Sequence, residues 1–220
     1  MTRWLALTTL VVLIAPGCEP APEVVPPDVL GQLQRTHDLS HVRAAVLTGD
    51  GFHDAEAMIP MAFLRLRGAE VTILGPETGE VTAYNSNHTL TIHQAARDAD
   101  PNAFDVLILP GGRAPDAIRQ DESVVRFARE FFQLDRPVAA ICHGAQVLIT
   151  AGVIEGRRLT CVGAIQEEVV EAGGTYVDRP VVVDGHLITS RLPGDIPDFT
   201  IAMAMALVDH PAPIASPVMD

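Results

Sequence analysis

The chain has 220 residues, of which 48% are hydrophobic, enough for one α/β domain with a full core and rather short for two. Its formal net charge is −13, from 15 Lys and Arg against 28 Asp and Glu. So acidic a chain repels a phosphate backbone, and composition therefore argues against nucleic acid as a partner.

The first 17 residues have the composition of a secretory signal. A cationic start at Arg3 precedes an apolar run from Trp4 to Ala15, which is too short to span a bilayer well. Cys18 follows this run, and its position resembles a bacterial lipoprotein processing site. We expect residues 1–17 to be removed and Cys18 to carry lipid, which predicts an extracytoplasmic protein, periplasmic or on the cell surface, anchored to a bacterial membrane. Plain secretion is the alternative.

Residues 18–40 are predicted to form a tether. The part from Glu19 to Asp28 holds four prolines and three acids, a composition that extends and solvates a chain. The folded domain is expected over residues 41–210, with a C-terminal tail at 211–220.

The folded part alternates between predicted strands and helices. Continuous apolar runs bounded by glycine or proline predict buried parallel strands at 42–48, 71–75, 105–110 and 137–142. Amphipathic or capped segments predict helices at 54–67 (with Asp54 as the N-cap), 123–133, 144–151 and 195–208. Residues 181–190 predict a hairpin or a strand pair. Continuous apolar strands need helices on both faces, so we expect an α/β fold with a mostly parallel sheet between helical layers.

A cysteine stands where the fourth strand gives way to a helix. In AICHG (140–144), the small Ala140 before Cys142 and the glycine after it permit the sharp turn of a nucleophile elbow. The following helix N-terminus is expected to lower the pKa of the thiol, because the positive end of the helix dipole favours thiolate. On this motif alone two interpretations stay open: an activated nucleophile, or a core cysteine.

Two glycine-containing turns end other strands. LPGGRAP (109–115) carries Gly112, whose N–H can hold a developing oxyanion together with the N–H of His143; a plain turn is the alternative. GFHDAEAMIP (51–60) carries Glu56 near the start of a helix. These turns lie at the carboxyl ends of parallel strands, where such sheets bind ligands.

Together these motifs resemble the ThiJ/PfpI family, within the class I glutamine amidotransferase-like superfamily, and most closely its PfpI branch, intracellular protease I. The resemblance runs from about Val42 to about Val208 and rests on E-x-x-x-P, LPGGRAP, AICHG, GRRLT and TSRLPGD in this order. It implies a flavodoxin-like, doubly wound sheet in a single domain. No phosphate-binding glycine loop is visible, and no cofactor is expected.

The resemblance also implies roles for individual residues. Cys142 looks like the nucleophile, and Glu56 like the carboxylic acid that hydrogen-bonds its sulfur, so that the two share a proton. Gly112 and His143 match the oxyanion-hole donors. His143 also matches the base of the PfpI branch, and Asp116 the acid that reaches it from a neighbouring subunit, which implies a dimer or hexamer. Aspartate stands where the family has glutamate, and capping of the next helix is its alternative role.

Four neighbouring positions add contacts or depart from the family pattern. Val162 stands where members often present a tyrosine or histidine toward the thiol. His53 occupies a frequently acidic position, and is either a site contact or an exposed loop histidine. Arg113 is a candidate site contact. Cys161 is expected in the core, with a resolving thiol for oxidised Cys142 as the alternative.

No metal site is expected. Adjacent Cys142 and His143 lack the spacing at which two side chains converge on zinc, which disfavours a set completed by His53 and Glu56. The other histidines are expected at the surface: His37, His41, His88, His93, His186 and His210.

The sequence thus predicts a cysteine-dependent enzyme that acts on carbonyl compounds, as a glyoxalase or deglycase, or on peptides, as a PfpI-like hydrolase. The thiolate adds to a carbonyl carbon, two N–H groups hold the oxyanion, and His143 or Glu56 moves protons. The alternative is a non-enzymatic oxidative-stress sensor or chaperone-like protein that uses oxidation of Cys142. A binding module without catalysis is a third alternative, if Val162 and Asp116 have disabled the site.

Overall fold

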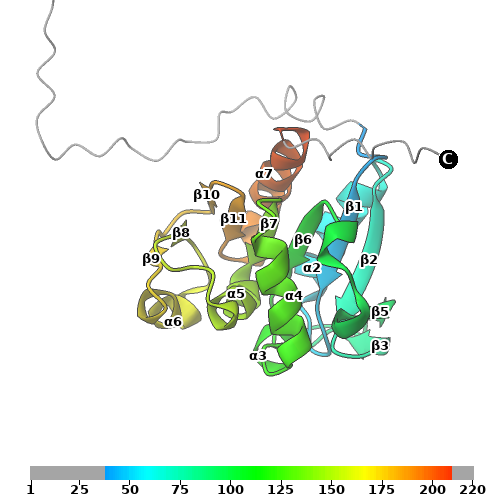
Figure 1. Ribbon diagram of the computed structural model, residues 1–220, viewed down its shortest axis with the longest axis horizontal. Coiled ribbons are helices and arrows are strands. Elements are labelled where there is room, and N and C mark those ends of the chain that lie inside the picture. The colour runs from blue at the N-terminus through cyan, green and yellow to red at the C-terminus, as the bar shows by residue number, and fades with distance from the viewer. Residues whose placement is uncertain (1–37, 210–220) are drawn as a thin grey trace, which may run out of the picture.

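The computed structural model describes residues 38–209, which form a main sheet between layers of helices and two small two-stranded sheets (Figure 1). Leu39, assigned to the tether from sequence, is fully buried, and its N–H donates to the carbonyl of Arg67. The packed core therefore includes a residue before the predicted boundary. Four predicted features lie outside the described residues: the signal at 1–17, Cys18, the tether up to residue 37, and the tail at 211–220.

The main sheet contains seven strands: β1 (Arg43–Leu47), β2 (Glu70–Gly75), β5 (Gln94–Ala95), β6 (Val106–Leu109), β7 (Val138–Ile141), β10 (Val181–Asp184) and β11 (Leu187–Ser190). Their order is β10-β11-β7-β6-β1-β2-β5, and only the edge pair β10–β11 is antiparallel. Every residue of β6 and β7 is buried, which explains their continuous apolar sequences. The predicted single-domain, doubly wound α/β fold is confirmed.

Helices cover both faces of this sheet. On one face α2 (Asp54–Arg65) packs against α7 (Ile196–Asp209), and on the other α4 (Glu122–Phe132) packs against α5 (Ala145–Ala151). Two short helices, α3 (Ala114–Ile118) and α6 (Gln166–Glu171), adjoin α5. The N-cap of α2 is His53, and the predicted cap Asp54 lies in the first turn instead. Among residues 38–209, no helix combines the length and apolar character needed to cross a membrane.

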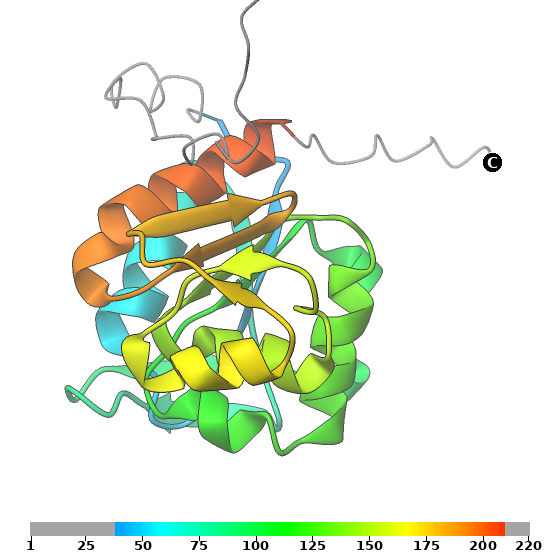
Figure 2. The ribbon, with the colours of Figure 1, turned by 90° about the vertical axis from the view of Figure 1, so that its left-hand side faces the viewer.

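Smaller elements were not predicted from the sequence. They are a hairpin of β3 (Gly79–Thr82) and β4 (Thr89–Ile92), a parallel pair of β8 (Arg158–Leu159) and β9 (Thr175–Tyr176), and 3-10 turns at Ala96–Asp98, Pro101–Ala103, Gly163–Ile165 and Pro193–Asp195. Figure 2 shows the β8–β9 pair beside the edge of the main sheet, with α7 beyond β10 and β11.

Candidate active site

Cys142 lies at the carboxyl end of β7, on a sharp turn into α5. Its φ is +60°, in the left-handed region that non-glycine residues rarely adopt. The turn passes through a 3-10 segment, η3 (Cys142–Gly144), before α5 begins. Gly144 is required there, because a Cβ atom would lie 2.0 Å from the carbonyl oxygen of Leu109. The backbone thus makes the strained strand-to-helix turn of an elbow.

Three groups surround the Cys142 sulfur. The backbone N–H groups of Gly112 and His143 both hydrogen-bond it, and Nδ1 of His143 lies 3.4 Å from it. Gly112 has a φ of +94° and pairs with Phe52, which fixes its N–H at the end of β6. The two N–H groups expected from sequence to form an oxyanion hole therefore converge on the thiol.

Glu56 is fully buried in the first turn of α2. Its Oε2 accepts the N–H of Gly111 at 2.9 Å, and its carboxyl lies close enough to the Cys142 thiol for each group to affect the ionisation of the other. Burial raises the pKa of Glu56 to about 7, although the Gly111 hydrogen bond and the thiol act in the opposite direction. Gly111 allows the contact, because a Cβ atom there would lie 2.6 Å from Oε2 and 2.7 Å from Cβ of Cys142.

The Cys142 thiol is itself buried, and burial together with the Glu56 charge raises its pKa to about 12. The N–H groups of Gly112 and His143 favour thiolate but do not outweigh these effects. The prediction that a helix N-terminus lowers the thiol pKa is therefore wrong. Thiolate is favoured only while Glu56 holds a proton, so the two groups titrate as a pair.

Besides Asp116, His143 has polar neighbours that were not predicted from the sequence. Arg119 bridges two acids, with Nη1 2.5 Å from Glu168 and Nη2 2.7 Å from Asp116. The second oxygen of Glu168 accepts Nε2 of Gln146 at 3.0 Å. Burial lowers the pKa of His143, and the charges of Glu168 and Asp116 act in the opposite direction. These acids therefore lie within electrostatic range of the imidazole.

Asp116 does not cap a helix. It lies in the first turn of α3, whose N-cap is Arg113, so the capping alternative is wrong. Its side chain is 68% exposed and is held by Arg119 of the same chain. The carboxylate is thus available at the surface next to the site.

An aromatic rim borders the thiol. The rings of Tyr84 and His53 meet edge to face with centroids 5.7 Å apart, and the Arg113 guanidinium lies 5.1 Å from the Tyr84 centroid. Only 14% of the His53 side chain is exposed, so the exposed-loop alternative for it is wrong. Burial raises the pKa of Tyr84, and the charge of Cys142 adds to this effect, which places Tyr84 within electrostatic range of the thiol.

The loop that carries Tyr84 is fastened to the start of α2. Asp54 accepts the side-chain amide of Asn85 at 2.7 Å and lies 3.3 Å from Nδ1 of His88. Hydrogen bonds, that of Asn85 first, hold the pKa of Asp54 far below its ordinary value. The N–H of Tyr84 donates to the carbonyl of Phe52 at 3.0 Å. The rim is therefore tied to the segment that positions Glu56.

The second cysteine belongs to the other side of the sheet. Cys161 is fully buried in the cluster under α4 and α5, as predicted, whereas Cys142 belongs to the cluster under α2 and α7. Burial raises the pKa of Cys161 to about 12. Val162 packs against both clusters, and its N–H donates to the Cys142 carbonyl at 3.5 Å. A valine thus occupies the position where the family pattern leads one to expect a polar side chain.

The remaining histidines and cavities lie elsewhere. His186 is buried, with its ring 4.4 Å from that of Phe132, so its predicted surface position is wrong. His37 and His210 lie outside the described residues, and the other three are exposed. Within residues 38–209 no three His, Cys, Asp or Glu side chains are grouped to hold a metal ion.

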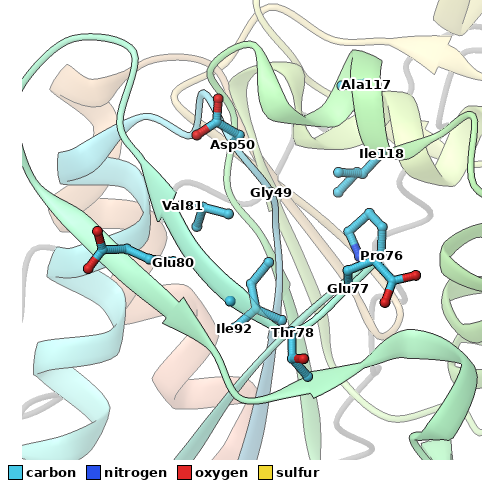
Figure 3. A pocket seen from close by; sticks show the side chains of 11 residues that line it. Gly49, Asp50, Pro76, Glu77, Thr78, Glu80, Val81, Ile92, Ala117 and Ile118 are labelled. Carbon is cyan, nitrogen blue, oxygen red and sulfur yellow. The ribbon is translucent and has the colours of Figure 1, made fainter.

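A cavity of about 340 Å³ lies between the β3–β4 hairpin and α3, and Figure 3 shows the side chains that line it. Its walls come from the turn after β1, from the segment before β3 and from α3. It shares no lining residue with the cluster around Cys142, and its chemistry is therefore separate from that of the thiol.

Comparison with known proteins identifies the family. The family model described as the DJ-1/PfpI family matches residues 42–206. The chain belongs to the DJ-1/PfpI family. "Protein/nucleic acid deglycase 2" of Escherichia coli is 42% identical over 159 residues, covering 71% of this chain and 92% of that protein. "Deglycase PfpI" of Pyrococcus furiosus is 41% identical over 150 residues, covering 68% and 90%.

A solved structure from Anabaena variabilis agrees with this assignment. It holds DJ-1/ThiJ/PfpI-like and ferritin-like domains, and it superimposes with a TM-score of 0.74 at 36% identity. The match covers 76% of this chain and 48% of that one. Membership of the DJ-1/PfpI family confirms the predicted resemblance and a cysteine-dependent enzyme of the deglycase or protease-like type.

The predicted location of this DJ-1/PfpI protein is wrong. Its archaeal and bacterial relatives are named as deglycases, in one case of protein and nucleic acid. This contradicts an extracytoplasmic, lipid-anchored protein. The signal-like run and Cys18 lie before the family match, which begins at residue 42.

Proposed function

We propose that this protein converts small 2-oxoaldehydes by addition of the Cys142 thiolate to the aldehyde carbon, and that their hemiaminal adducts react in the same way once the C–N bond breaks, which releases the amine and restores the aldehyde. The observation that carries this proposal is the convergence of two backbone N–H groups, a proton-sharing carboxyl and an imidazole on one thiol. Cys142 is only 8% exposed, which suits a small carbonyl compound better than a polypeptide. The net charge of −13 disfavours nucleic-acid adducts as substrates.

The proposed chemistry begins with the shared proton. Glu56 takes the thiol proton, the sulfur forms a bond to the aldehyde carbon, and the electron pair of the C=O bond moves onto oxygen. The N–H groups of Gly112 and His143 hold this oxyanion, which then takes a proton to give a hemithioacetal. The acid–base pair of Glu56 and His143 next moves the proton from the aldehyde carbon toward the neighbouring ketone, which yields a 2-hydroxy thioester.

Water then cleaves the C–S bond, which releases a 2-hydroxy acid and restores the thiol. One carbon of the substrate is oxidised and its neighbour is reduced, so no external oxidant or reductant is consumed. Methylglyoxal consumption with detection of lactate tests this proposal beside a panel of peptide substrates. Peptide cleavage without lactate formation would show a hydrolase instead.

Replacement of Glu56 with glutamine is expected to change the pH dependence of thiol alkylation. In the wild type, the pair loses its first proton near the pKa of Glu56, about 7, so the rate with iodoacetamide rises through this pH and then levels off. Glutamine keeps the shape and removes the titration. The alkylation rate of the variant should rise only once with pH, without the step near pH 7. An unchanged step near pH 7 would show that Glu56 does not titrate together with the thiol.

The same variant has a second readout in stability. Because the folded protein raises the pKa of Glu56 from 4.5 to about 7, it binds a proton that the unfolded chain has lost, and stability falls as pH rises through this window. Urea unfolding should therefore show a loss of about 1 to 3 kcal/mol across the window in the wild type, and none from this group in Glu56→Gln.

We further propose that the site is completed between subunits of a homo-oligomer, a dimer or a hexamer. The Asp116 side chain is exposed next to the site, so its carboxylate is accessible to a neighbouring subunit, where it could orient an imidazole. A mixture of inactive Cys142→Ala and inactive Asp116→Ala subunits is expected to recover part of the activity, because some interfaces then pair an intact Cys142 with an intact Asp116. Full activity of Asp116→Ala alone, or an active monomer on a sizing column, would contradict the shared site.

A further inference from the structure

Arg113 holds a fixed place beside the proposed oxyanion hole. It follows Gly112, whose N–H bonds the Cys142 sulfur. The N–H groups of Arg113 and Ala114 both donate to the carbonyl of Gly51, at 2.8 and 3.2 Å. Hydrogen bonds therefore hold the backbone of Arg113 against the turn after β1, and its side chain is exposed.

The guanidinium has no anionic partner among the described residues. The guanidinium instead lies over the Tyr84 ring, with its carbon 5.1 Å from the ring centroid. Arg119, six residues further along the chain, is by contrast paired with two carboxylates, those of Asp116 and Glu168. The planar fork of Arg113 thus keeps its hydrogen-bond donors free for a ligand.

The two acids whose charges act on the Tyr84 hydroxyl, as that of Arg113 does, are already engaged. Asp54 accepts the N–H of Ala55 at 2.6 Å and the amide of Asn85 at 2.7 Å. Glu56 is fully buried and bonded to Gly111. An anionic group brought in by a substrate therefore meets a cation that no carboxylate of the site neutralises.

Tyr84 links this cation to the reacting atom. The positive charge of Arg113 favours ionisation of the Tyr84 hydroxyl, whereas the charges of Cys142 and Glu56 oppose it. Tyr84 therefore lies within electrostatic range of both the guanidinium and the thiol.

We propose that Arg113, backed by Tyr84, binds a carboxylate carried by the carbonyl substrate, so that the preferred substrates are anionic 2-oxoaldehydes. This inference rests on the proposed function, which it narrows. A carboxylate can receive two parallel N–H bonds from the fork, which orients the substrate as well as binding it. A protein with a net charge of −13 repels anions at a distance. The preference for an anionic over a neutral substrate must therefore come from this contact at the site.

The turnover test compares 4,5-dioxopentanoate with its neutral methyl ester, which share the reacting 2-oxoaldehyde. In the wild type, kcat/KM is expected to be higher for the acid, and Arg113→Gln should lower the acid-to-ester ratio about 10-fold. Arg113→Lys keeps the positive charge but lacks the planar pair of N–H donors. Its acid-to-ester ratio should therefore lie between those of the wild type and Arg113→Gln. Arg65→Gln, which removes the same charge from the far end of α2, is the matched control. An unchanged ratio in Arg113→Gln, or an equal fall in Arg65→Gln, overturns the proposal.

A binding test keeps the result independent of turnover. Glyoxylate can add reversibly to the thiol as a hemithioacetal, and the neutral glyoxal serves as the reference. Glyoxylate is expected to protect Cys142 from iodoacetamide at about 10-fold lower concentration in the wild type than in Arg113→Gln, with glyoxal unaffected. Equal protection in both proteins overturns the anion site. Protection as expected, with neither dioxo compound converted, would instead refute the proposed function and leave the Arg113 site standing.

Discussion

Replacement of Cys142 with alanine is expected to abolish turnover of 2-oxoaldehydes while the fold stays intact. The sulfur is the atom on which the N–H groups of Gly112 and His143 and the Glu56 carboxyl converge, so its removal leaves no nucleophile for them to assist. Loss of a residue that acts as one unit with its neighbours costs more than about 1,000-fold in rate. The measurement is lactate formation from methylglyoxal, together with the thermal unfolding midpoint.

Cys161→Ala is the matched control for this variant. It removes the other buried thiol, which lies in the opposite core cluster. This variant is expected to keep the wild-type rate, with a small loss of stability from the vacated volume. Turnover by Cys142→Ala at a tenth of the wild-type rate or more would contradict a covalent mechanism.

Replacement of Gly144 with alanine is expected to destabilise the protein by at least about 3 kcal/mol. The new methyl carbon would lie 2.0 Å from the Leu109 carbonyl oxygen and 2.8 Å from its carbon. Leu109 belongs to β6, where it pairs with Ala140 of β7, so its backbone cannot withdraw without breaking the centre of the sheet. Urea unfolding should show a lower midpoint with an unchanged slope.

Gly163→Ala is the control for the glycine change. A Cβ atom at Gly163 meets nothing within 4 Å, so the same substitution there should cost less than about 1 kcal/mol. Equal destabilisation at both positions would contradict the close approach of the elbow to β6. Iodoacetamide labelling of Gly144→Ala adds a second check, because a displaced elbow exposes the thiol and removes the pH step near 7.

Much of the sheet and the position of the thiol could be predicted because both depend on local sequence. A strand buried on both faces needs apolar residues at every position, and β6 and β7 have them. An elbow needs a nucleophile between small residues, and AICHG provides this arrangement. The short β3–β4 hairpin gave no such signal, because three of the four residues in β3 are exposed.

The contacts around the thiol could not be predicted, because they join segments far apart in the chain. Glu168 lies 49 residues from Arg119, in a helix without a motif. Tyr84 follows a hairpin strand and meets Arg113 only in the folded protein. The direction of the thiol pKa was wrong for the same reason: the helix dipole is a local effect, whereas burial and the Glu56 charge depend on packing.

At the proposed subunit boundary, Asp116 would have to exchange its ion pair with Arg119 for a hydrogen bond to an imidazole of another subunit. A carboxylate that turns toward an imidazole of another subunit must loosen its hold on Arg119, which Glu168 continues to hold. Salt weakens the exposed Asp116 pair more than the partly buried Glu168 pair, and so frees Asp116 without releasing the guanidinium. Ionic strength and protein concentration should then act together on activity, with dilute enzyme the most sensitive to salt.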